Sequence, residues 1–198
     1  ILGDILMSLN KHLLRSVRNN NYEPTDDGRI LLPRDGVYVG GVYSNRVRRN
    51  GEVLHDWSHN HNIVVDEGLT HMLDVLLSAG TQITSWYFGI FETNYTVLAA
   101  DTGATIASAS TECTAYDEST RQAWVDGGAA AKVINNTGNE ATFTMNATKI
   151  VYGAFLAESS TKNGTSGKLL SGGLFSPSRS LISGDELDVG YEYTASDA

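Results

Sequence analysis

The chain has 198 residues, a formal net charge of −9 at pH 7 and one cysteine, Cys113. This length allows one domain with a packed core and an extension, and the 41% hydrophobic content indicates a globular protein. The acidic charge argues against a specific nucleic-acid ligand, a single cysteine excludes an intrachain disulfide, and no apolar run is long enough to span a membrane.

Charge is distributed unevenly along the chain. The first 50 residues carry eight Lys/Arg and five Asp/Glu, whereas the remaining 148 carry six Lys/Arg and eighteen Asp/Glu. This pattern predicts a basic arm followed by an acidic domain rich in Gly, Ser, Thr and Ala. A chain of this kind is expected to attach to other proteins.

Residues 1–35 are predicted to form a helix followed by an extended arm. Within residues 5–18, apolar side chains recur at helical spacing and basic side chains occupy the other faces. The apolar residues are Leu6, Leu9, Leu13, Leu14 and Val17, and the basic residues are Lys11, Arg15 and Arg18. A helix this short is marginal in water, so it needs a partner surface. The candidate interface residues of this segment are Leu9, Leu13, Arg15 and Arg18.

Residues 36–80 are predicted to form a β-ribbon followed by a helix. The dipeptide Asn50-Gly51 favours a type I′ turn between two strands of the ribbon. The basic side chains beside this turn are expected to be exposed and to meet acidic groups on a partner protein. They are Arg46, Arg48 and Arg49.

Three aromatic residues, Tyr38, Tyr43 and Trp57, lie on the ribbon or at its end. On a projecting element they would anchor an interface, because Tyr, Trp and Arg dominate contact energies. The alternative is that these side chains cover the core of their own domain. All three are treated as candidate interface residues.

The strongest helical pattern covers residues 66–79. Asp66 is expected to cap the start of the helix, and Gly80 stands where a C-terminal cap belongs. The apolar face of this helix consists of Leu69, Met72, Leu73, Leu76 and Leu77.

Residues 81–198 are predicted to form an antiparallel β-sandwich or jelly-roll-like domain, so the fold class is mainly β with one or two short helices. The aromatic-rich run at 86–91 indicates a central strand packed on both faces. The small-residue run at 99–110 is predicted to be a surface loop. The expected strands cover residues 86–91, 121–125, 132–135, 140–145, 149–156, 168–175, 179–182 and 186–194.

Metal-ligand residue types cluster only at His55, His59 and His61. On a strand these three side chains would point to one face and could meet a cation. No second set of ligands has suitable spacing, so neither a metal site nor a cofactor is predicted.

The remaining reactive residue types form no catalytic constellation. Carboxylates at Asp26-Asp27, Asp117-Glu118 and Glu158 are interpreted as solvated turn residues. Cys113 follows Glu112, whose charge would raise the pKa of the thiol, so a structural cysteine is predicted. Because no nucleophile elbow, Walker loop or dinucleotide-binding fingerprint occurs, the protein is predicted not to be an enzyme.

Several segments resemble a family of tailed-bacteriophage virion proteins, over roughly residues 36–198. The segments are Asn62-Ile63-Val64-Val65-Asp66-Glu67-Gly68-Leu69, Trp86-Tyr87-Phe88-Gly89-Ile90-Phe91, Tyr116-x-Glu118-Ser119-x-Arg121, Tyr152-Gly153-Ala154-Phe155-Leu156 and Gly184-Asp185-Glu186-Leu187. Such proteins are usually encoded among head and tail structural genes, so the resemblance implies a virion component. It supplies no catalytic residue.

The leading hypothesis is a capsid decoration (cement) protein that stabilises the shell by binding neighbouring coat subunits. Its expected location is the virion, which is assembled in the bacterial host cytoplasm. A tail, head–tail connector or fibre-attachment subunit is the first alternative. A carbohydrate-binding module for host attachment is the second. The expected partners are the major capsid protein or tail and connector proteins, together with further copies of the chain in a homo-oligomer.

Overall fold

The computed structural model describes residues 23–24, 30–31 and 37–197, and the description below is confined to them. Residues 39–195 form one unit, and residues 1–38 with 196–198 form a second. In the second unit, strands β1 (Glu23–Pro24) and β2 (Ile30–Leu31) pair antiparallel. The helix predicted at 5–18, with its candidate interface residues Leu9, Leu13, Arg15 and Arg18, lies outside the described residues.

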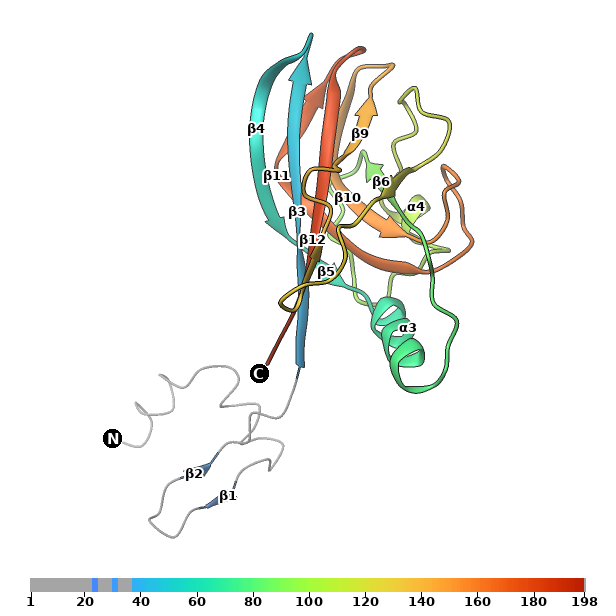
Figure 1. Ribbon diagram of the computed structural model, residues 1–198. Helices are drawn as coiled ribbons and strands as arrows, with labels where there is room; N and C mark the ends of the chain where they lie inside the picture. Colours follow the sequence, from blue (N-terminus) through green and yellow to red (C-terminus); the bar gives the residue numbers. More distant parts are fainter. Residues whose placement is uncertain (1–22, 25–29, 32–36, 198) are drawn as a thin grey trace, which may run out of the picture. The chain divides into compact units, whose positions relative to one another are not determined.

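Residues 39–195 fold into two sheets of antiparallel strands (Figure 1), which confirms the predicted mainly β sandwich. The first, called the β10 sheet, has the strand order β5-β11-β10-β6-β7. The second, called the β12 sheet, has the order β4-β3-β12-β8, and β9 also pairs with β12. The strands are β3 (Val37–Arg49), β4 (Glu52–His61), β5 (Ile63–Val64), β6 (Trp86–Phe91), β7 (Gln122–Trp124), β8 (Val133–Asn135), β9 (Ala141–Thr144), β10 (Lys149–Ala157), β11 (Leu169–Leu181) and β12 (Glu186–Asp197).

The predicted hairpin turn is confirmed at the junction of β3 and β4. Asn50 and Gly51 have φ values of 52° and 80°, as a type I′ turn requires of its two central residues. The flanking residues Arg49 and Glu52 are paired across the hairpin. The ribbon predicted from residue 36 contributes its strands to the same sheets as the later segments, so residues 39–195 form one unit.

Strand β6 shows why the β10 sheet is apolar on both faces. Phe88 and Ile90 join the cluster that fills the space between the two sheets. Phe91, which points the opposite way, joins a second cluster with Phe155 and Ile106 on the outer face of the β10 sheet. Successive side chains of β6 therefore point alternately into the two apolar clusters, as predicted for a strand packed on both faces.

Two strands predicted separately, at 168–175 and 179–182, are one strand, β11. Val151 of β10 pairs with Arg179, but Gly153 pairs with Leu174, so β11 carries extra residues between these two pairs. Pro177 lies among them, where a residue without a backbone N–H interrupts no ladder bond. A bulge in β11 therefore lies where the sequence predicted a gap between two strands.

The two α-helices of the described residues are α3 (Asp66–Leu77) and α4 (Ile106–Ala109). The N-cap residue of α3 is Val65, which makes no side-chain capping bond, so the predicted cap at Asp66 is wrong. Asp66 and Glu67 instead lie in the first turn, where negative charge favours the helix dipole. Helix α4 lies inside the run predicted as a loop, and its Ile106 is fully buried in the outer cluster.

We predict that Gly153→Ala destabilises the protein. A Cβ at this position would meet the carbonyl oxygen of Gly173 and the ring of Phe91. Such overpacking costs roughly 1–3 kcal/mol in the free energy of unfolding, which urea denaturation followed by tryptophan fluorescence would measure. The matched control is Gly40→Ala, because a Cβ at Gly40 meets nothing within 4 Å. Equal effects of the two substitutions would contradict the packing argument.

Candidate functional site

Three arginines of β3 pair with three carboxylates at and just before the start of β12. Arg49 donates from Nε and Nη2 to the two carboxylate oxygens of Asp185, at 2.7 and 2.8 Å. Arg48 donates from Nη2 to Oδ1 of Asp188 at 2.7 Å, and its Nη1 lies 2.6 Å from Oε2 of Glu186. We call the whole set the arginine–carboxylate cluster, and its members are Arg46, Arg48, Arg49, Asp185, Glu186 and Asp188.

Asp188 is the most connected member of the arginine–carboxylate cluster. Its Oδ2 accepts from Nε and Nη2 of Arg46 at 3.0 and 2.8 Å, and its Oδ1 also accepts from Thr142 at 2.8 Å. Burial by itself raises the pKa of Asp188, but the hydrogen bonds from Arg48, Thr142 and Arg46 outweigh it, so the pKa is lowered. The carboxylate therefore stays ionised although its side chain is only 3% exposed.

The cluster changes the interpretation of the three arginines. They are 26–38% exposed, and each guanidinium is bound to a carboxylate of its own chain. These arginines also account for the positive charge of the first 50 residues, because residues 1–38 carry five Lys/Arg and five Asp/Glu. The expectation of a basic arm is therefore corrected, whereas contact of these arginines with a partner protein stays a prediction.

The aromatic candidates of the ribbon divide between core and surface. Tyr43 has no exposed surface, its ring centroid lies 4.5 Å from that of Tyr191, and its hydroxyl lies 2.8 Å from Oγ of Ser171. An interface role for Tyr43 is therefore wrong, because strand alternation directs it between the sheets. Trp57 is half-buried under Arg46, whose Cζ lies 4.6 Å from the ring centroid. Tyr38 is 49% exposed.

The three histidines lie on β4 but do not share one face. His59 and His61 pair with Ser44 and Val42 and line a cavity of about 380 Å³ on the β12 sheet. Between them and His55 the register shifts, so that His55 pairs with Val47, an inward-facing residue. A β-bulge reverses the alternation. Among the residues described, no three or more His, Cys, Asp or Glu side chains are grouped to hold a metal ion.

The remaining reactive groups have structural partners. Glu112 and Arg121 form a fully buried ion pair at 2.7 Å, and Arg121 also donates to the carbonyl oxygen of Ser159 at 2.9 Å. Burial, together with nearby Glu92, raises the pKa of the Cys113 thiol to about 12, so at neutral pH the side chain is a thiol. The sequence had assigned that influence to Glu112, which is bound to Arg121 instead.

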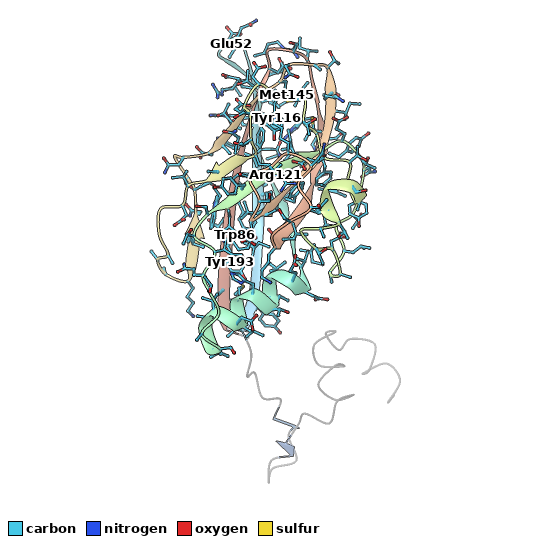
Figure 2. The ribbon with its side chains drawn as sticks, turned by 90° about the vertical axis from the view of Figure 1, so that its right-hand side faces the viewer. Glu52, Trp86, Tyr116, Arg121, Met145 and Tyr193 are labelled. Atoms are coloured by element: carbon cyan, nitrogen blue, oxygen red, sulfur yellow. The ribbon has the colours of Figure 1, made fainter. Side chains whose placement is uncertain are left out.

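Helix α3 carries the apolar face that the sequence predicted, and only part of that face is buried. His71 is buried against Trp86, with ring centroids 6.0 Å apart, and the hydroxyl of Tyr193 donates to Sδ of Met72 at 2.6 Å. Figure 2 shows Trp86 and Tyr193 beside this helix, at the end of the domain opposite Glu52. These contacts hold one side of the helix and leave three leucines on the other.

We call these three side chains the α3 leucine face. Leu73, Leu76 and Leu77 are 58%, 73% and 82% exposed. Their i, i+3 and i+4 spacing places them on one side of the helix. An exposed group of leucines is unfavourable in water and is typical of a contact surface. The sequence showed the apolar stripe itself, but only the positions of Gly68 and His71 against the sheet decide which side is buried.

Beside this face lies an open cavity of about 590 Å³. Its lining combines the polar residues His71, Asp74, Glu158 and Lys168 with Tyr87. The carboxylate of Glu158 already accepts the backbone N–H of Lys168 at 2.9 Å, and this bond closes the loop between β10 and β11. The α3 leucine face and this polar cavity together form the most distinctive surface of residues 39–195.

The fold and surface together define an acidic antiparallel β-sandwich with an exposed apolar helix. No model of a known protein family matches the chain, and no curated protein matches its sequence. Within the described ranges, none of the helices combines the length and apolar character needed to cross a membrane.

Asp188→Asn is expected to lower the free energy of unfolding by about 3 kcal/mol at pH 7, because it leaves Arg46 and Arg48 without their buried counter-charge. A lowered carboxyl pKa gives stability that is complete above the unfolded pKa of about 3.9 and is lost as pH falls through the folded pKa. The wild-type protein should therefore lose stability below about pH 4, and the variant should lose less over that interval.

Urea denaturation between neutral and acidic pH would measure both effects. The control is Glu186→Gln, which removes a carboxylate that is 34% exposed and bound to Arg48 alone. It should cost at most about 1 kcal/mol. If Glu186→Gln lowered the free energy of unfolding as much as Asp188→Asn, burial would not explain why the ion pairs of Asp188 matter more.

A chelator is predicted to leave the melting temperature unchanged. The bulge at His55 separates it from His59 and His61, and a structural metal would add about 10 kcal/mol or more to folding. Calorimetry with and without EDTA tests this. A large drop in melting temperature that zinc restores would contradict the prediction.

Proposed function

We propose that this chain is a structural subunit of a tailed-bacteriophage virion, and specifically a capsid decoration protein that binds neighbouring coat subunits. The observation that carries the proposal is the division of the chain into an N-terminal unit and a separate sandwich of residues 39–195. The segments that resemble phage virion proteins fall within this sandwich. The N-terminal unit falls outside it, and we assign the attachment to that unit.

The sandwich itself has the properties of a stiff building block. Its most buried charges, Asp185 and Asp188, are matched by arginines, and Glu112 is matched by Arg121. Apolar clusters cover both faces of the β10 sheet. A domain whose buried charges are satisfied internally binds through its surface and its extensions, which is how a cement protein is expected to work.

Attachment through an extension suits a protein that reinforces a shell. A segment that becomes ordered on contact can bury a large area over several neighbouring subunits. Repetition of the same contact around a lattice then adds avidity. The same features fit a tail or connector subunit, which differs from a decoration protein in copy number. A glycan-binding role lacks such support, because Tyr38 is the single aromatic among the strongly exposed apolar residues of the described part.

Deletion of residues 1–35 is expected to leave a folded sandwich that no longer joins particles. The melting temperature should change little, because residues 39–195 form a unit of their own. Particle binding should be lost, as measured by co-sedimentation of the purified chain with particles that lack it. Normal binding of the truncated chain would contradict the proposal.

Copy number separates the decoration role from the connector role. A cryo-EM reconstruction of intact particles would place the chain and count it. Copies that follow the coat lattice are expected, whereas a single ring at one vertex would favour the connector alternative.

A further inference from the structure

We propose that the α3 leucine face binds residues 5–18 of a second copy of this chain, so that neighbouring copies exchange their N-terminal segments. This inference goes beyond the attachment role proposed above, because it assigns part of the N-terminal unit to another copy of the chain. The binding surface belongs to the described domain, and its occupant is identified by the apolar pattern and charge of its sequence.

The apolar parts of the two surfaces match. Leu73, Leu76 and Leu77 are more than half exposed in the sandwich. Residues 5–18 offer Leu6, Leu9 and Leu13, spaced by three and then four positions, and need a partner surface to form a stable helix. Two such stripes pack by placing the ridges of one helix in the grooves of the other. Each apolar stripe would therefore remove the other from contact with water.

The charges of the two surfaces are opposite. Helix α3 contains Asp66, Glu67 and Asp74 and no Lys or Arg, whereas residues 5–18 contain three Lys/Arg and no Asp or Glu. Asp66 and Asp74 are exposed. The last turn of α3 has no basic residue of its own, so the negative end of the helix dipole also favours a cation there. A cationic amphipathic segment is thus favoured over a neutral or acidic one.

The length of the connecting chain permits an exchange between copies. Because Glu23 pairs with Leu31, residues 24–30 add little reach, and the eleven residues 19–22 and 32–38 would span about 36 Å when fully extended. A domain of this size has a radius of gyration of about 15 Å, so the segment can reach beyond its own domain to a neighbour. In an assembly with many copies, each chain then donates its own segment and binds the segment of a neighbour. Every α3 leucine face is thereby covered.

A complementation experiment on the full-length chain tests the exchange without knowledge of its register. One variant, Leu76→Glu with Leu77→Glu, damages the receiving face, and another, Leu9→Glu with Leu13→Glu, damages the donated segment. Sedimentation velocity is expected to show self-association of the wild-type chain and at least about tenfold weaker association of each variant alone. A mixture of the two variants should associate again, because one intact segment can meet one intact face.

The matched control is Leu98→Glu, since Leu98 is 55% exposed but lies outside α3. Circular dichroism melts should show that all variants remain folded. Three outcomes would overturn the inference: a wild-type chain that remains monomeric, association that survives the α3 substitutions, or a mixture of variants that fails to associate. The first result would indicate that the face binds its own segment or an unrelated protein.

The same variants separate this inference from the proposed function. If the mixture fails to associate while deletion of residues 1–35 abolishes particle binding, the exchange is wrong and the proposed function stands. If the truncated chain binds particles normally while the mixture associates, the attachment role is wrong and the exchange remains.

Discussion

The sandwich depends on the neutralisation of two buried carboxylates where β12 begins. Asp185 and Asp188 have almost no exposed side-chain surface, and a buried carboxylate without a cation strongly destabilises a fold. The cations come from β3, and Arg48 lies 140 residues before its partner Asp188. Because β3 and β12 are neighbours in one sheet, the first and last strands of the domain are joined by charge as well as by backbone hydrogen bonds. The same bonds brace the hairpin that β3 forms with β4.

Because these arginines pair with carboxylates of their own chain, few cations remain for the rest of the sandwich surface. Residues 39–195 carry nine Lys/Arg and seventeen Asp/Glu, and three of the nine cations are held by the cluster at β12. An acidic surface of this kind repels a second copy of itself. Apolar side chains and cationic segments are therefore the parts of the chain best suited to bring copies together. The α3 leucine face is such an apolar part, at the end of the domain opposite the hairpin turn (Figure 1).

Local patterns predicted the elements well wherever the cause is local. The turn at Asn50-Gly51 follows from the tolerance of Asn and Gly for positive φ, and β6 spans residues 86–91 as its aromatic run predicted. Where burial depends on residues far away in the sequence, local patterns predicted less, as for Tyr43 and for the surface loop that contains α4. The leucines of α3 form a helical stripe, but close contact of Gly68 with the backbone of Leu170 turns that stripe outward.

The sequence by itself determined the mainly β class, the positions of nearly every strand, the hairpin turn and the acidic character of the domain, because periodicity and turn chemistry act over a few residues. Only the tertiary structure decided that Arg46, Arg48 and Arg49 bind their own chain, that Tyr43 is buried and that His55 is separated from His59. Pairs of residues more than a hundred positions apart leave no local pattern in a single sequence. A bulge adds one residue and reverses every side chain beyond it, which alternation alone cannot predict.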